Sequence, residues 1–371
     1  MYRAKILTLL IFIMVLLFVC NPVWAAPVPP QITADSAILM DIQTGQILFE
    51  KNAFEKRPPA STTKILTALL ALEGGDLNQL VTVSPRAAAT GESSIHLQAG
   101  EKLTLEELIY GALIESGNDA CVAIAEHIAG KEENFVQLMN HKAKLLGAIN
   151  TNFVNTNGLP AKDHYSSAYD LAILTRHALH NPVFNNIVST HEKIISGPGW
   201  NRYLHNTNRL LETYDGADGV KTGTTDAAGQ CLVASATKDN RRLVCVVLHS
   251  EDRYFDSTTL LEYGFNNFEY VEVAVKGQPF GKIRVKEGTT PEVSVVAQSD
   301  LGAVIPRKHP ELIEKKVVMA KELIAPVADE QITGQVELFV SGNRVGTTKL
   351  ITLQQVSRLP DYKILLKRLI K

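Results

Sequence analysis

The sequence predicts an α+β domain followed by a small all-β, sandwich-like domain. Residues 35–51 alternate apolar and polar side chains in the manner of a hairpin, and the chain is mostly helical between residues 61 and 179. Three strand-like runs follow between residues 220 and 248, and from residue 271 onward only short alternating runs occur. Strands that flank a helical region and close on a strand meander indicate an α+β layer arrangement.

The first 25 residues read as a signal peptide. Arg3 and Lys5 give a basic start, residues 6–19 are apolar apart from Thr8, and residues 23–25 place small side chains where a signal peptidase cleaves. The alternative is a retained membrane anchor, for which the apolar run is short. We expect an exported, extracytoplasmic protein.

Composition excludes several classes of protein. The 371 residues contain 37 Lys and Arg against 39 Asp and Glu, a formal net charge of −2, so no strongly basic nucleic-acid-binding surface is expected. Cys121, Cys231 and Cys245 lie in apolar runs and are expected to be buried, not paired. No Cys-x-x-Cys or His-x-x-x-His spacing occurs, so we expect neither a metal nor a cofactor.

The first domain is expected over residues 26–270. A hairpin turns at residues 41–45, and the Pro58-Pro59 pair precedes the first helix. The expected helices are 61–72, 103–129 with a break at 116–118, 134–146, 167–179 and 255–264, and the expected strands are 220–224, 230–237 and 242–248.

The second domain is expected over residues 271–357, with an amphipathic tail over 358–371. Its predicted strands are 271–275, 281–285, 293–297, 317–323, 335–340 and 344–350. In the tail, apolar residues recur at helical spacing opposite basic ones, which is typical of a helix that docks on a membrane surface. The alternative is a terminal helix packed on the β domain.

Three short motifs occur in one order: Ser61-Thr62-Thr63-Lys64, Ser116-Gly117-Asn118 and Lys221-Thr222-Gly223. A second Ser-x-x-Lys at 235–238 and a second Ser-Gly-Asn at 341–343 show that each motif alone is weak evidence. The second copies are predicted to lie at a strand end and in a hairpin turn. Only in the first set does every motif lie in a predicted structural setting where its side chains can take part in a reaction.

The first motif has the spacing of a nucleophile and its base. Residues three apart share a helix face, so Ser61 and Lys64 are expected to be neighbours. A serine needs such a base, and a lysine serves as one only when burial or a nearby cation lowers its pKa from about 10.4. The apolar helix supplies burial, and Lys221 is the expected second cation.

The other two motifs supply proton transfer and binding groups. Ser116 can relay a proton and Asn118 can hold a carbonyl group. Lys221, Thr222 and Gly223 are predicted to lie on a strand along which a peptide adds as a further strand. The backbone N–H groups of Ser61 and Thr224 are then the expected oxyanion donors.

These motifs, the run 216–229 and the trailing β domain resemble the low-molecular-mass penicillin-binding proteins, and among them the serine-type D-alanyl-D-alanine carboxypeptidases. The resemblance implies a β-lactamase/transpeptidase-like fold for the first domain. It implies cleavage of the terminal D-alanine from peptidoglycan pentapeptides through an acyl-enzyme, inhibition by β-lactams, and a location on the outer face of the cytoplasmic membrane.

The resemblance also implies roles for individual residues. Ser61 would be acylated, Lys64 would be its base, and Ser116 would carry the proton to the leaving D-alanine. Asn118 would position the substrate amide, and Lys221 with Thr222 would face the terminal carboxylate. Arg253 lies where the family often carries an arginine that steers the carboxylate, and Thr224 stands where some members have histidine.

Two alternatives stay open at this point. A class A β-lactamase would need a Glu-x-x-Leu-Asn string for deacylation, and none occurs. A non-catalytic, penicillin-sensing or wall-binding protein of the same fold would not require Lys64.

Overall fold

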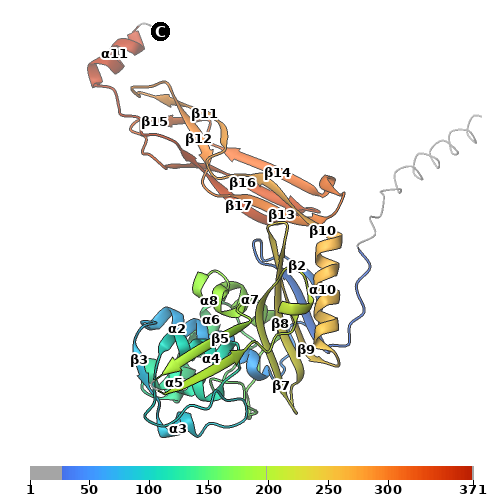
Figure 1. Cartoon of the computed structure of the whole chain (residues 1–371). Helices are drawn as coiled ribbons and strands as arrows, with labels where there is room; N and C mark the ends of the chain where they lie inside the picture. The colour runs from blue at the N-terminus through green and yellow to red at the C-terminus, as the bar shows by residue number, and fades with distance from the viewer. Residues whose placement is uncertain (1–26, 198, 370–371) are drawn as a thin grey trace, which may run out of the picture. The chain divides into compact units, whose positions relative to one another are not determined.

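The computed structural model describes residues 27–197 and 199–369, with side chains described up to residue 365. The predicted signal peptide lies outside the described residues. The first domain is built on an antiparallel five-stranded sheet in the order β2-β1-β9-β8-β7 (Figure 1). Its strands are β1 (Ser36–Asp41), β2 (Ile47–Lys51), β7 (Ala217–Thr225), β8 (Gly229–Lys238) and β9 (Arg241–Ser250).

Both faces of this sheet are covered. Every residue of β1 is buried, and alternate residues enter two different cores. Ile38 and Met40 join the core of the helical region, whereas Ala37 and Leu39 join the core beneath α10 (Arg253–Asn267). This division follows from the two-residue period of a strand. The predicted hairpin, the three later strands and the helix after them are confirmed.

Side-chain caps mark the start of several helices in the first domain. Thr104 and Glu107 form a capping box at the start of α4, and the Ser167 hydroxyl accepts the Asp170 N–H at the start of α7. The predicted break at residues 116–118 separates α4 from α5. The helices are α2 (Lys64–Gly74), α3 (Pro85–Ala88), α4 (Leu105–Leu113), α5 (Asn118–Ala129), α6 (Glu132–Leu145), α7 (Ala168–Ala178), α8 (Pro182–Val188) and α9 (Leu210–Thr213).

The hairpin of β5 (Glu192–Gly197) and β6 (Trp200–His205) escapes sequence-based prediction. Most of its residues are polar or partly exposed, and Ile194 lies opposite Tyr203 with both side chains exposed. It therefore lacks the alternation of a half-buried strand. The short pair β3 (Leu80–Thr82) and β4 (Lys102–Thr104) was missed as well.

The second domain is all-β, as predicted. A six-stranded sheet has the order β14-β16-β17-β12-β11-β15, and β10 (Phe268–Ala274) pairs with β13 (Leu301–Pro306). A strand was expected over residues 271–275, where β10 lies, but the sequence pattern did not reveal β13. Residues of both sheets share one core. The sheet consists of β11 (Pro279–Lys286), β12 (Glu292–Ala297), β14 (Ile313–Met319), β15 (Glu322–Ile324), β16 (Ile332–Val340) and β17 (Asn343–Thr352).

Two details of this domain bear on the sequence predictions. The single strand expected over 317–323 is wrong: β14 pairs with β16 at one edge of the sheet, and β15 pairs in parallel with β11 at the other. The second Ser-Gly-Asn is confirmed as a turn between β16 and β17, with positive φ at Ser341 and Gly342.

The chain ends in the short helix α11 (Asp361–Leu369). Ile364 is buried, whereas Tyr362 and Leu365 are more than half exposed. The side chains of Leu366, Lys367, Arg368, Leu369 and Lys371, on which the amphipathic pattern also depends, lie outside the described part. Within the described residues, every helix is too short or too polar to cross a lipid bilayer.

Candidate active site

Ser61 lies in a tight turn that precedes the buried helix α2. Residues Ala60–Thr63 form a 3-10 helix, whereas the sequence predicted that the α-helix itself starts at Ser61. The difference is local, because the Thr62 N–H bonds Pro59 O and the Lys64 N–H bonds Ser61 O. Ala60 has φ +48°, a left-handed conformation that is strained for any residue with a Cβ. The turn thus holds Ser61 in a sharp bend.

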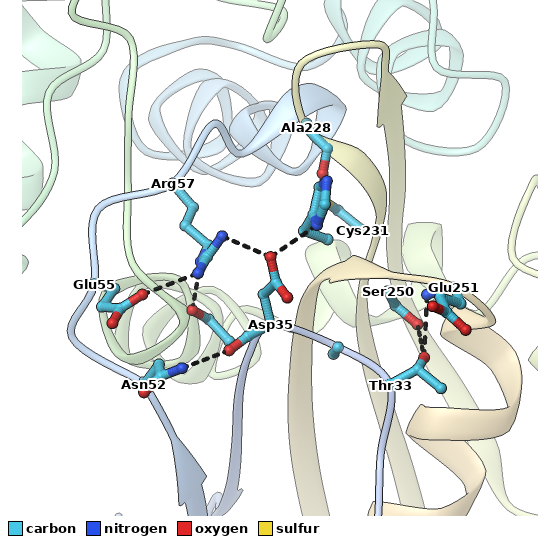
Figure 2. A network of polar contacts seen from close by, with 12 residues as sticks. Thr33, Asp35, Asn52, Glu55, Arg57, Ala228, Cys231, Ser250 and Glu251 are labelled. Carbon is cyan, nitrogen blue, oxygen red and sulfur yellow. Dashed lines mark hydrogen bonds and ion pairs between the residues drawn. The ribbon is translucent and has the colours of Figure 1, made fainter.

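The segment that leads into this turn is held by Arg57. Its backbone N–H and C=O pair with Ser166, and its guanidinium bonds Ser36 Oγ at 2.7 Å. Figure 2 shows the same guanidinium beside the carboxylates of Asp35 and Glu55. Each of the two ion pairs has an N···O distance of 2.9 Å. These contacts fix the chain four residues before the nucleophile.

Lys64 contacts three oxygens with its amino group. Nζ lies 2.8 Å from Ser61 Oγ, 2.7 Å from Asn118 Oδ1 and 2.7 Å from the backbone oxygen of Asn157. The side chain is fully buried, and this burial lowers the pKa of Lys64 to about 8, against the opposing effect of Asp119 and Glu92. The sequence-based expectation of a buried lysine next to Ser61 is confirmed.

The chemistry of the three acceptors determines what a neutral Lys64 does. Asn118 Oδ1 and the Asn157 carbonyl can only accept hydrogen bonds, whereas the Ser61 hydroxyl can donate one. A neutral amine has two N–H donors and one lone pair. The two carbonyl oxygens therefore take the two protons, and the lone pair points at the Ser61 hydroxyl. In its neutral form Lys64 therefore directs its lone pair at the Ser61 hydroxyl, which is the arrangement that general-base catalysis requires.

Ser116 and Asn118 occupy the junction of α4 and α5, as predicted. Ser116 is buried with φ +70°, so a second site residue holds a left-handed backbone conformation. The Asn118 Nδ2 donates to Gly91 O at 2.9 Å, which leaves Oδ1 for Lys64. Asn118 thus orients the amino group of Lys64.

Strand β7 brings the third motif alongside the turn of Ser61. Lys221 is buried, and its Nζ has no hydrogen-bond partner among the residues that the structure describes. Burial, followed by the charge of Lys64, holds the pKa of Lys221 well below its usual value. The expected lowering of the Lys64 pKa by Lys221 is not confirmed: burial lowers the pKa of Lys64, whereas the repulsion between the two lysines lowers the pKa of Lys221. An anion beside Lys221 would favour its ammonium form and give Nζ the partner that it lacks among the described residues.

The neighbours of Lys221 shape the same edge. The Thr222 hydroxyl lies 2.6 Å from the Thr207 hydroxyl. A Cβ on Gly223 would lie 3.0 Å from the Ser61 nitrogen and 3.2 Å from Pro59 O, so a side chain here would crowd the backbone of the turn. Because β7 is the edge strand of its sheet, its outer side is available for pairing.

Arg253, the first residue of α10, forms hydrogen bonds with Gly223 of the third motif and with Thr224. Its Nη1 lies 3.0 Å from Gly223 O and 2.8 Å from Thr224 Oγ1. The structure therefore places Arg253 and Thr224 together with Lys221, Thr222 and Gly223, and all nine residues predicted for the site fall on η1, α2, the α4–α5 junction, β7 and α10.

Sequence reasoning missed the loop that supplies the Asn157 carbonyl. Gly158 has φ +91°, and a Cβ there would overlap the carbonyl of Ala60. The Asn-Gly pair is a turn signal in the sequence, but nothing in it indicates contact with the turn of Ser61. No pattern in the sequence indicates that Thr207 contacts Thr222.

Two known family models match most of the chain. A family model described as "D-alanyl-D-alanine carboxypeptidase" matches residues 24–252, and one described as "Penicillin-binding protein 5, C-terminal domain" matches residues 268–358. This chain belongs to the D-alanyl-D-alanine carboxypeptidase family. Members are serine peptidases that work through an acyl-enzyme, so the expected fold and enzyme class are confirmed.

Similar proteins cover nearly the whole chain. D-alanyl-D-alanine carboxypeptidase DacF of Bacillus subtilis is 38% identical over 320 residues, which is 83% of this chain and 82% of that protein. DacD of Escherichia coli is 36% identical and covers 91% of this chain and 92% of its own. The crystal structure of penicillin binding protein 5 from Haemophilus influenzae superposes with a TM-score of 0.77 at 33% identity, covering 89% of this chain and 99% of that one.

Proposed function

We propose that this protein removes the terminal D-alanine from peptidoglycan stem peptides, with Ser61 as nucleophile and Lys64 as its base. The observation that carries the proposal is the 2.8 Å contact between Lys64 Nζ and Ser61 Oγ, set within two carbonyl acceptors. Membership of the family supports the substrate class.

The reaction starts when neutral Lys64 takes the Ser61 proton and the Ser61 oxygen attacks the carbonyl carbon of the penultimate D-alanine. The Ser61 and Thr224 N–H groups are the proposed donors to the oxyanion. Collapse breaks the peptide bond, and the proton reaches the leaving amine through Ser116. Water then hydrolyses the ester and restores the Ser61 hydroxyl. β-Lactams would acylate the same oxygen.

The substrate carboxylate is proposed to face Lys221 and Thr222. The peptide would pair along the edge of β7, where Gly223 leaves room, and Asn118 would contact its amide. Arg253 would hold Gly223 and Thr224 in place and add positive charge. An incoming carboxylate would give the unpartnered Lys221 ammonium its counter-ion.

We also propose that the protein is exported and docks on the outer face of the cytoplasmic membrane. The basic and apolar N-terminal segment supports export. Docking is supported by α11, where Tyr362 and Leu365 are exposed beside Lys363 and a further basic cluster follows in the sequence. A surface-bound helix would keep the enzyme near membrane-linked wall precursors.

The deciding experiment is mass spectrometry of the intact protein after incubation with labelled penicillin, combined with release of D-alanine from a peptide ending in D-Ala-D-Ala. Ser61→Ala should lose both, while Ser235→Ala, which removes the serine of the other Ser-x-x-Lys, should retain both. A labelled Ser61→Ala protein would refute the assignment of the nucleophile. A wild-type protein that is labelled but releases no D-alanine would be a penicillin-binding protein without this activity.

A further inference from the structure

His164 contacts Thr63 in the turn that carries Ser61, and it has no role in the proposed reaction. The side chain is buried, with Phe153 packed 5.7 Å from its ring centre. Its two ring nitrogens make contacts in opposite directions. Nδ1 accepts the Val154 N–H at 3.0 Å, and Nε2 lies 3.0 Å from the Thr63 hydroxyl.

These contacts determine where the imidazole proton lies. Because Nδ1 accepts a backbone N–H, it carries no proton, so the neutral ring carries its proton on Nε2. Nε2 then donates to Thr63 Oγ1, and Thr63 Oγ1 donates to Ala60 O at 2.8 Å. Burial lowers the pKa of His164 to about 4, which keeps the ring neutral at working pH. The result is a chain of three hydrogen bonds with a single direction.

The two ends of this chain are the two parts of the structure that surround the Ser61–Lys64 pair. One end is Ala60, the strained residue directly before Ser61. The other is Val154, three residues before the Asn157 carbonyl that accepts from Lys64. The carbonyl of Ala60 also lies directly against Gly158. If the loop shifted relative to the turn, the Ser61 hydroxyl would no longer be aligned with the lone pair of neutral Lys64.

We propose that His164 is a positioning residue that joins the strained turn carrying Ser61 to the loop carrying the Asn157 carbonyl. It touches neither substrate nor reacting atoms, and it acts through Thr63 and Val154. The inference rests on the proposed roles of Ser61 and Lys64. Its consequence is kinetic: the acylation step should depend on the hydrogen bond between His164 and Thr63.

Conservative variants isolate that bond. His164→Asn keeps an acceptor near the Nδ1 position but cannot reach Thr63, and Thr63→Val removes the hydroxyl at nearly unchanged volume. Thr63→Ser keeps the hydroxyl. Asn140→Ala is the matched control, because Asn140 anchors the same loop at both backbone groups of Phe153 without any bond to the turn of Ser61.

The experiment measures acylation of the full chain by labelled penicillin over a range of concentrations, which separates the acylation rate constant from the dissociation constant of the reversible complex. His164→Asn and Thr63→Val should each lower the rate constant about tenfold and leave the dissociation constant within about twofold. The double variant should be no slower than Thr63→Val alone, because that change already removes the bond with His164 together with the bond to Ala60 O. Thr63→Ser and Asn140→Ala should stay within about threefold of the wild type.

Three results would overturn the proposal: an unchanged rate constant in folded His164→Asn, losses that multiply in the double variant, or an equal loss in Asn140→Ala. If thermal unfolding shows that His164→Asn does not fold, the test is the ratio of the acylation rate constants of Thr63→Ser and Thr63→Val. Equal rate constants for these two variants would overturn the proposal. A wild-type protein that penicillin never acylates would contradict the proposed function instead, so the two failures are distinguishable.

Discussion

Two lysines buried within the first domain determine the chemistry of this site. Lys64 has three oxygen partners, whereas the Lys221 Nζ has none among the described residues. Burial disfavours the ammonium form of both side chains and lowers both pKa values. The two proposed roles, a base and an anion-binding cation, can therefore be filled by the same residue type, because the acceptors around the two amino groups differ.

The pH dependence of acylation should follow Lys64. With a pKa of about 8, the neutral base grows as pH rises, so the acylation rate constant should climb about tenfold per pH unit below 8 and level off above it. Stopped-flow labelling with a fluorescent penicillin between pH 5 and 10 measures this profile. Lys64→Ala should lose about 10²–10⁴-fold at the plateau. A rate independent of pH across this range would contradict lysine as the base.

Recognition of a terminal carboxylate should depend on Lys221. A peptide ending in D-Ala-D-Ala should be cleaved about ten- to a hundredfold better than its C-terminal amide, because a charge-assisted hydrogen bond contributes about 1.5–3 kcal/mol. The ratio of the two kcat/KM values is the measurement. In Lys221→Met the acid should lose its advantage; equal cleavage of acid and amide by the wild type would count against the proposal.

The same variant has a consequence for stability. The folded-state pKa of Lys221 lies below its unfolded value, so the unfolded chain binds more protons at neutral pH, and this residue makes stability rise with pH up to the unfolded pKa. Lys221→Met removes that buried ammonium. It should raise the free energy of unfolding at pH 7 by about 1–4 kcal/mol, with a smaller gain near pH 10. Urea unfolding at both pH values provides the comparison.

At the scale of elements, the site depends on a close approach between the turn η1 and the loop at residues 153–158. Thr67 Oγ1 donates to Thr156 O at 2.6 Å, and the Asn155 side chain accepts the Gly158 N–H at 2.7 Å. Helix α2 and the loop thus form one unit around Lys64. Strand β7 closes the other side through Gly223.

A methyl group at Gly158 should disrupt that unit. Gly158→Ala would strain a backbone at φ +91° and press its Cβ into the Ala60 carbonyl, so acylation should fall at least about tenfold. Gly130→Ala is the control: its φ is +76°, but nothing lies within 4 Å of the added Cβ. It should cost about 1 kcal/mol of stability and leave the acylation rate unchanged. Equal effects of the two variants on acylation would show that only backbone strain matters.

At the scale of the whole molecule, the catalytic motifs and the terminal helix belong to different domains. The site residues end at Arg253, and the β domain separates them from α11. Activity on a soluble peptide and attachment to a membrane should therefore be separable properties.

Deleting residues 359–371 tests this separation. The truncated protein should leave the membrane fraction, because each basic residue near an anionic surface contributes about 1 kcal/mol, and exposed Leu365 is removed as well. Its kcat/KM on a soluble peptide should stay within about twofold. Flotation with anionic vesicles measures binding, and vesicles of neutral lipid serve as the control. Lost soluble activity would instead identify the tail as a packing helix.

The sequence by itself predicts the strands of the first sheet, the longer helices of the first domain, the all-β second domain and the pairing of Ser61 with Lys64. Each is encoded over a short stretch: alternation defines a strand, and a spacing of three places two side chains together near a helix start. The strand after Met319 was misjudged, because its partner lies at the far edge of the sheet.

Only the tertiary structure decided what surrounds the nucleophile. The Asn157 carbonyl is 93 residues from Lys64 in sequence, His164 is 101 residues from Thr63, and Thr207, which contacts Thr222, lies in the segment after β6. Whether a lysine is a base depends on its burial and on the acceptors around it. These come from several segments at once, so no local pattern in the chain can encode them.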